Sequence, residues 1–291
     1  MKFGLLIPIA APYATARYVE KLGRLAEDHG FDSLWVGEHA VVPADWESKY
    51  PVGETGTLPS AVRFGELDPW TSLCYLAAVT QRIRLGACAV VPQRNPVYTA
   101  KEVANADWLS GGRIDFGAGI GWAHEEFEAL QAPFAKRGAR CTSYLKLIKR
   151  LWTEPVVEYA DEFYQMRASL LYPKPVQRPH VPIHILGQSG APIERVAEIG
   201  DGFFPLDQSP EQMATIVSDL DAALRRRGRS LAEITVSATP YDKGCDLAKV
   251  EAYRRAGVDQ VVLFQFVEDI DELEPVIAGF VRNVVEPGRA L

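Results

Sequence analysis

The sequence lacks the patterns that mark several large classes of protein. Its 291 residues contain only four cysteines, and no two of them form a C-x-x-C pair. This spacing suits a reducing compartment and argues against a disulfide framework. The five histidines form no H-E-x-x-H motif and have no cysteine at ligand spacing, so we expect no metal site. A nucleophile elbow of the G-x-S-x-G type is also missing.

Charge and apolar runs exclude further classes. The 31 basic and 38 acidic residues give a net charge of −7, which argues against a sequence-independent nucleic-acid binder. No stretch reaches the roughly 18 apolar residues of a membrane span. The short apolar run at the N-terminus is broken by Pro8 and Pro12 and is interpreted as a first strand rather than a signal peptide. We therefore expect a cytoplasmic protein with neither a membrane nor a nucleic-acid partner.

What the sequence does contain is a repeated unit of strand followed by helix. Nearly all-apolar strands predict a parallel sheet buried on both faces. A count of eight such units favours a closed (β/α)₈ TIM barrel, formed as one domain by residues 1–291. A doubly wound sheet is the competitor, but it lacks support from a glycine fingerprint after the first strand. The predicted strands are 3–7, 33–36, 83–91, 113–116, 181–186, 202–206, 234–238 and 260–264.

Two segments do not follow the repeat. Residues 40–67, after the second strand, are rich in proline and glycine and contain aromatic residues. A loop of this length in a compact domain is usually functional or disordered, so it is either a lid over a pocket or a mobile insertion. Residues 156–164, before the fifth strand, predict a small hairpin insertion.

Glycine-rich turns follow two of the strands. The stretch SGGRIDFGAGIGWAHEE (110–126) passes from a strand through alternating glycines into a helical start, and GQSG (187–190) repeats the arrangement. Glycine lets the backbone approach a ligand closely, and a helix N-terminus attracts anions. Neither stretch is a dinucleotide fingerprint or a P-loop. On spacing alone, a phosphate site and a tight structural turn are about equally favoured at the first of these corners.

His39 is the strongest candidate for acid–base chemistry. It follows the second buried strand and stands beside Glu38, which could fix its tautomer or raise its pKa. Loops after the strands of a barrel share one face, so His39, Glu38 and both glycine turns are expected to meet there. The alternative is that His39 has only a structural role and is hydrogen-bonded to backbone groups.

These residues together resemble the luciferase-like monooxygenase superfamily, and within it the branch of oxidoreductases that use the deazaflavin coenzyme F420. The resemblance extends from near the N-terminus to about residue 207, and beyond that only the barrel pattern matches. It rests on DSLWVGEH (32–39), DPW (68–70), TQRIRLGACAVVPQRNP (80–96), SGGRIDFGAGIGW (110–122), EEF (125–127), RGAR (137–140), GQSG (187–190) and AEIGDGFFP (197–205).

The resemblance implies roles for these positions. His39 would lie against the reactive ring of the cofactor, with Glu38 beside it. Cys88 and Ala89 match the place where the family often has a non-prolyl cis peptide behind the ring. Residues implied to hold the ribityl phosphate and ring edge are Gly119, Ile120, Gly121, Trp122, Gly187, Gln188, Ser189 and Gly190. Trp46, Tyr50, Trp70 and Trp122 would form apolar walls for the substrate.

The sequence departs from the sugar-phosphate dehydrogenase branch, which has a glutamate where Trp122 stands. We therefore expect hydride transfer between F420 and a small, largely apolar substrate, in a homodimer like those of many relatives. The alternatives are an FMN-dependent monooxygenase that uses reduced FMN and oxygen, and a non-catalytic flavin-binding barrel.

Overall fold

The computed structural model of the chain describes residues 1–53, 56–188 and 190–291. Parallel strands form a closed barrel in the order β1-β10-β9-β8-β7-β4-β3-β2, which confirms the predicted (β/α)₈ TIM barrel. The barrel strands are β1 (Lys2–Leu6), β2 (Ser33–Val36), β3 (Arg84–Val90), β4 (Ile114–Gly119), β7 (Ile183–Leu186), β8 (Gly202–Phe204), β9 (Thr235–Ala238) and β10 (Gln260–Phe264).

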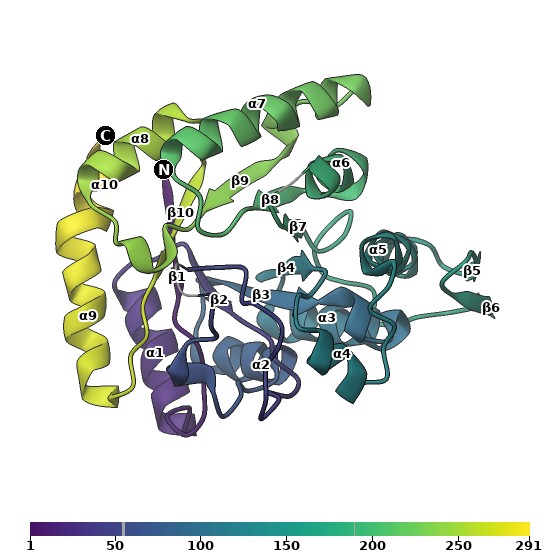
Figure 1. The fold of residues 1–291 in the computed structure, drawn as a ribbon, viewed down its shortest axis with the longest axis horizontal. Coiled ribbons are helices and arrows are strands. Elements are labelled where there is room, and N and C mark those ends of the chain that lie inside the picture. The colour runs from purple at the N-terminus through teal and green to yellow at the C-terminus, as the bar shows by residue number, and fades with distance from the viewer. Residues whose placement is uncertain (54–55, 189) are drawn as a thin grey trace.

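Helices surround the barrel, and the β5–β6 hairpin projects outward beyond α5 (Figure 1). The hairpin, β5 (Val157–Ala160) and β6 (Gln165–Ser169), confirms the predicted insertion. The α-helices are α1 (Ala16–Asp28), α2 (Pro69–Val79), α3 (Pro96–Ser110), α4 (His124–Ala129), α5 (Arg137–Thr153), α6 (Gly190–Ile199), α7 (Pro210–Arg226), α8 (Leu247–Arg255), α9 (Leu273–Phe280) and α10 (Glu286–Ala290).

Local sequence signals explain where several helices begin. The Thr15 hydroxyl accepts a hydrogen bond from the amide of Tyr18 and caps α1. Asp68 accepts from the amide of Thr71, and Pro69 occupies the first helical position of α2. Such caps satisfy amides that have no partner inside the helix, and proline fits there because its missing N–H would be unpaired anyway.

A second, smaller cluster of buried side chains lies apart from the main core between strands and helices. It combines the strand residues Leu6, Trp35, Phe204, Val262 and Phe264 with Val52 and Tyr241 from the following loops. The indole of Trp35 lies across β3, where a Cβ at Gly86 would stand 2.3 Å from it. Glycine at this position is therefore required by a close approach.

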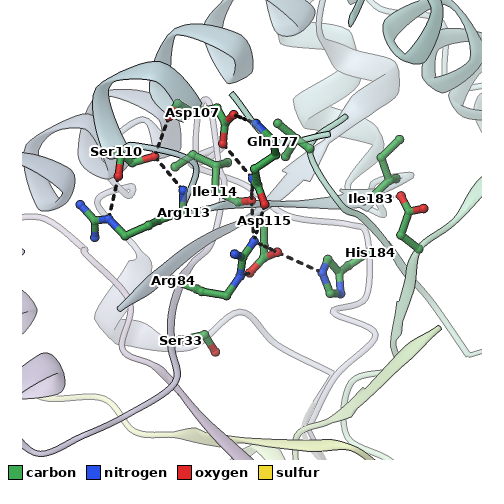
Figure 2. A network of polar contacts seen from close by, with 12 residues as sticks. Ser33, Arg84, Asp107, Ser110, Arg113, Ile114, Asp115, Gln177, Ile183 and His184 are labelled. Carbon is green, nitrogen blue, oxygen red and sulfur yellow. Dashed lines mark hydrogen bonds and ion pairs between the residues drawn. The ribbon is translucent and has the colours of Figure 1, made fainter. Parts of the chain in front are cut away.

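The N-terminal ends of the strands hold a polar network, which Figure 2 shows around Asp115. Arg84 donates two hydrogen bonds to the carboxylate of Asp115, of 2.7 and 2.6 Å, and Nε2 of His184 lies 3.4 Å from it. The side-chain amide of Gln177 joins the network by donating to Asp107 and to the carbonyl of Ile114. We call Arg84, Asp115 and His184 the closed-end cluster.

Three expectations from the sequence need correction. The fourth strand does not end at residue 116, as predicted, but continues to Gly119. Within it, Gly117 packs closely against β3: a Cβ there would stand 2.5 Å from the carbonyl oxygen of Ala87. That glycine serves strand packing rather than a turn. The non-prolyl cis peptide that the resemblance implies at Cys88–Ala89 is not present. Both residues pair in register with β4, and the cis bonds of the described ranges all precede proline. The sequence also predicts a closing helix over 270–285; the structure has α9 only at Leu273–Phe280, followed by a π-helical segment at Val281–Val285.

Within the described ranges, no helix is long and apolar enough to cross a membrane. The same part of the chain contains no group of three or more His, Cys, Asp or Glu side chains placed to hold a metal ion.

Candidate active site

The carboxyl ends of the strands surround a cavity of about 270 Å³. His39 lines it, together with Gly119, Gly121, Trp122 and Gly187. The structure thus brings both glycine turns and the candidate histidine to one place, as a barrel requires of loops that follow its strands. Cys88, Ala89, Ile120 and Glu38 also line this cavity.

Glu126 is the hydrogen-bonding partner of His39. Its Oε2 lies 3.3 Å from Nδ1 of His39, and its Oε1 accepts from the amide of Ala40 at 2.8 Å. Burial alone lowers the pKa of His39, but the hydrogen bond and charge of Glu126, with Glu66 and Glu38, raise it above the ordinary value. Because the Nδ1–H group of His39 donates to the carboxylate of Glu126, Nε2 is the ring nitrogen left for proton exchange.

Glu38 has other partners, so the expectation that it fixes the tautomer of His39 is wrong. Its carboxylate accepts from the amide of Val90 at 2.5 Å and from Nε of Arg94 at 2.6 Å. Burial raises the pKa of Glu38, while Arg94 opposes the shift. The guanidinium of Arg94 also pairs with Asp68 and Glu102. Glu38 therefore anchors β2 to β3 and reaches His39 only through its charge.

An aromatic wall closes one side of the histidine. The indoles of Trp46 and Trp122 stack with their ring centres 5.0 Å apart, and His39 meets both edge-on at 6.2 and 6.0 Å. Tyr50 contacts Trp122 edge-on at 5.2 Å, and its hydroxyl lies 3.0 Å from that of Tyr241. Burial raises the pKa of Tyr50 to about 12, so this phenol remains a neutral hydrogen-bonding group.

Trp70 does not belong to this wall. It is 3% exposed and packs against Phe116, 5.6 Å between ring centres, in the main core. It lies inside the first turn of α2, where the helix covers the barrel, rather than in a loop at the strand ends. The expectation that Trp70 lines the substrate pocket is therefore not met.

The two glycine turns precede helices of different length. Helix α4 has only six residues, and the amide of His124 donates to Ser48 of the 40–67 loop at 3.0 Å. This corner therefore holds the loop, and its helix is too short to support an anion site. Gly121 has a φ of +76°, and a Cβ there would stand 2.7 Å from Phe127 and from Val90. Only glycine fits that turn without strain.

The second turn opens α6, a helix of ten residues that begins at Gly190. A Cβ at Gly190 would meet nothing within 4 Å, so the space beside the first residue of the helix is open. Gly187 borders the cavity, whereas the side chain of Gln188 turns back and donates to the carbonyl of Leu206 at 2.6 Å. Ser189, predicted to bind the cofactor, lies outside the described residues.

Loop 40–67 is tied to the barrel at several points. Oε1 of Glu125 accepts from the amides of Glu47 and Ser48 at 2.7 and 2.8 Å. Asp207 accepts from the amide of Gly53 at 3.2 Å. Of the two interpretations of this loop, the structure favours a cover over the cavity, because Tyr50 and Val52 line it.

Sequence reasoning missed Glu66, Glu126 and Tyr241 as neighbours of the site. Glu126 belongs to the quoted EEF stretch, so a signal was present for it. Arg137, in the RGAR stretch, is one of three arginines that the sequence offers as cations for an acidic tail, with a surface ion pair as the alternative. Nε of Arg137 donates to the carbonyl of Gly121 at 3.0 Å, and its guanidinium lies 3.9 Å from the ring centre of Phe134. This places a cation at the first glycine corner.

Known proteins share sequence features with this chain over most of its length. The family described as "Luciferase-like monooxygenase" matches residues 1–241. The chain belongs to this family. It is 35% identical over 210 residues, 70% of this chain and 74% of the relative, to an uncharacterized protein of Mycobacterium tuberculosis. It is 29% identical over 159 residues to the FMNH(2)-dependent dimethylsulfone monooxygenase of Pseudomonas putida, covering 54% of this chain and 44% of that one.

Solved structures share the fold of this luciferase-like protein. Monooxygenase RslO1 from Streptomyces bottropensis has a TM-score of 0.78 at 22% identity, covering 98% of this chain and 99% of that one. The coenzyme F420-dependent tetrahydromethanopterin reductase from Methanopyrus kandleri has a TM-score of 0.75 at 19% identity, covering 98% of each chain. A monooxygenase and an F420-dependent reductase therefore both occur among its structural neighbours, and the family match makes the chain a luciferase-like oxidoreductase.

Proposed function

We propose that this protein transfers hydride between coenzyme F420 and a small, largely apolar organic substrate. The observation that carries the proposal is the shared cavity, in which His39 and both glycine turns lie beside an indole wall. The F420-type motifs of the sequence support the choice of cofactor. Trp122, at the position of a glutamate in the sugar-phosphate branch, supports an apolar substrate. We also propose that residues 1–291 act as one domain and pair as a homodimer.

The residues present fit a planar cofactor that carries a phosphate. The amides at the start of α6 suit an anion, and Arg137 places a positive charge at the neighbouring glycine corner. At Gly119 the nearest atom to a Cβ would be the carbonyl oxygen of Ala89 at 3.4 Å, which leaves room for a ring beside β3. Trp122 and Gly121 supply an apolar edge to the same space.

A bound deazaflavin would supply the hydride chemistry, as cofactors generally do. The protein's own residues orient the reactants and manage the proton. Glu126 holds the imidazole of His39 by Nδ1, so that Nε2 exchanges a proton at the substrate. Trp122 and Tyr50 line that side of the cavity and exclude water from it, while Trp46 stacks behind Trp122 rather than lining the cavity itself. Exclusion of water strengthens the remaining electrostatic interactions.

A titration with F420, FMN and FAD, monitored by quenching of protein fluorescence, tests the cofactor. We expect F420 to bind much more tightly than either flavin. Tight binding of FMN with negligible affinity for F420 would contradict the proposal. His39→Ala should keep cofactor affinity but lower turnover by about 10²-fold or more, as expected for loss of an acid–base group. Undiminished turnover would remove any chemical role for His39 and favour a barrel that only binds flavin.

A second candidate is a monooxygenase that uses reduced FMN and oxygen. The similarity to the Pseudomonas putida dimethylsulfone monooxygenase favours it, and the start of α6 suits the phosphate of FMN equally well. Substrate-dependent oxygen consumption with reduced FMN would support this alternative over F420.

A further inference from the structure

Glu66 is a carboxyl group at the cavity that the proposed function has not used. It lies near the end of loop 40–67, where the chain forms an antiparallel bridge between Ala10 and Glu66. The amide of Leu67 donates to the carbonyl of Ile9, and the amide of Ala11 to that of Gly65, both at 3.0 Å. The backbone is thus fixed on both sides of Glu66, even though the loop as a whole is long.

The side chain of Glu66 reaches the end of β2 and lines the cavity with His39. Its carboxyl lies over Gly37, where a Cβ would stand 2.7 Å from Oε2. Within the described ranges, no hydrogen-bond donor reaches either oxygen of this carboxyl. Glu38 and Glu126, by contrast, each accept hydrogen bonds from a backbone amide and a side chain.

The groups that interact electrostatically with Glu66 are mostly acidic. They are His39 and Glu38 from the end of β2, Glu126 from α4, Cys88 from β3 and Tyr50 from its own loop. Arg94, the ion-pair partner of Glu38, also pairs with Asp68 and Glu102. Burial raises the pKa of Glu66; His39 opposes the shift, while Glu38 and Glu126 add to it. A neutral carboxyl has an O–H to offer.

We propose that Glu66 is a second acid–base residue of this cavity and that it recognises a carbonyl or hydroxyl oxygen of the substrate. The inference rests on the proposed function, because a carbonyl reduced by hydride needs a proton at its oxygen. It also specifies the substrate: an apolar molecule with one carbonyl, or the corresponding alcohol.

Atoms and electrons balance when this step runs in the reducing direction. A bound reduced deazaflavin would supply the hydride, hence both electrons, so that one of its own C–H bonds is broken as a C–H bond forms at the carbonyl carbon. The O–H bond of Glu66 breaks as its proton passes to the carbonyl oxygen, so that an alcohol forms and Glu66 becomes a carboxylate. In the oxidising direction, the same carboxylate takes the proton back from the alcohol.

Infrared spectroscopy of the cofactor-free protein tests the protonation state directly. We expect protonated-carboxyl absorption that persists above the pH at which ordinary glutamates ionise, to which Glu66 and the buried Glu38 can both contribute. The difference between the wild-type and Glu66→Gln spectra should contain one such band, which is the band of Glu66. The matched control Glu128→Gln, exposed on α4 and paired with His124 at 3.3 Å, should show no such difference from the wild type. A Glu66→Gln spectrum with the same protonated-carboxyl absorption as the wild type would overturn the proposal.

A second measurement tests the contact with substrate without turnover. Cyclohex-2-en-1-one serves as the probe, added to the protein with oxidised F420. We expect its carbonyl stretch to move to lower frequency in the wild type and in Glu128→Gln, but not in Glu66→Gln. An unshifted band in the wild type, or an equal shift in Glu66→Gln, would contradict the role of Glu66. Failure of F420 to bind at all would instead contradict the proposed function, while the carboxyl band of the free protein would still report on Glu66.

Discussion

The two ends of the barrel each hold a histidine against a carboxylate, yet the two arrangements differ in charge balance. In the closed-end cluster, the carboxylate of Asp115 pairs with the side chains of Arg84 and His184 (Figure 2). Burial by itself raises the pKa of Asp115, but the bonds from His184 and Arg84 outweigh it and lower that pKa to about 2. The ionised form is therefore strongly favoured at this end.

At the cavity end, acids outnumber the available cations. His39 pairs with Glu126, while Glu38 and Glu66 lie nearby, and burial raises the pKa of both. Arg94 is shared between Glu38 and two outer carboxylates. Crowded acids with raised pKa values are typical of functional sites, where stability is given up for chemistry. The comparison teaches that a buried carboxylate paired with a cation, such as Asp115, serves stability, whereas a buried carboxyl among other acids, such as Glu66, is available for chemistry.

The largest expected effect of a substitution in the closed-end cluster is on stability. Asp115→Ala leaves Arg84 and His184 without their shared partner, and breaking a buried ion pair in this way costs about 3–5 kcal/mol. Urea denaturation should show this loss in the free energy of unfolding, while the folded fraction keeps its cofactor affinity. The control Asp219→Ala, exposed on α7, should stay within about 0.5 kcal/mol of the wild type.

A loss of cofactor affinity in Asp115→Ala that matches its loss of stability would break the comparison. It would mean that the closed-end cluster is coupled to the cavity rather than separate from it.

A smaller effect is expected on how the free energy of unfolding depends on pH, because Asp115 at the closed end and Glu66 at the cavity end have pKa values shifted in opposite directions. Asp115 has a lowered pKa in the folded state, so its contribution is present above its unfolded value of 3.8 and is lost as pH falls toward about 2. This shift corresponds to about 2 kcal/mol. Asp115→Asn should therefore flatten the acid limb of a stability curve measured by urea denaturation between pH 5 and pH 2. An acid limb as steep as that of the wild type would show that other carboxylates carry the dependence.

The fold was predictable because its signals are local. Apolar runs bounded by turn residues identified β2 and β10 to the residue, and Asp68-Pro69 identified the start of α2. Each of these signals depends on neighbours within a few positions. The barrel then followed from the count of strands, and the meeting of both glycine turns followed from the barrel.

The partners within the site were not predictable in the same way. Glu126 reaches His39 across 87 positions of sequence because α4 packs beneath loop 40–67. Glu38, although adjacent to His39, points to Arg94 instead. Trp46 and Trp70 look alike in the sequence, but one stacks in the site and the other fills the core. Such outcomes depend on where side chains point, and no spacing in the sequence encodes that direction.

The smallest expected effect is that of Glu66→Gln on the free energy of unfolding, and it tests whether a carboxyl at the cavity destabilises the fold. Glu66 has a raised pKa, so its contribution to stability is fully present below the unfolded pKa and falls as pH rises through the folded value. Glu66→Gln removes this ionisation and should raise the free energy of unfolding at pH 8 by about 1 kcal/mol or less, with little change at pH 4. Glu128→Gln serves as the control at both pH values.

Glu66→Gln should also abolish the carboxyl band of Glu66. A gain in stability accompanied by loss of that band would show directly that the cavity keeps an acid the fold does not need. A loss of stability at pH 8 would instead place Glu66 with Asp115, among the carboxylates that hold the barrel together.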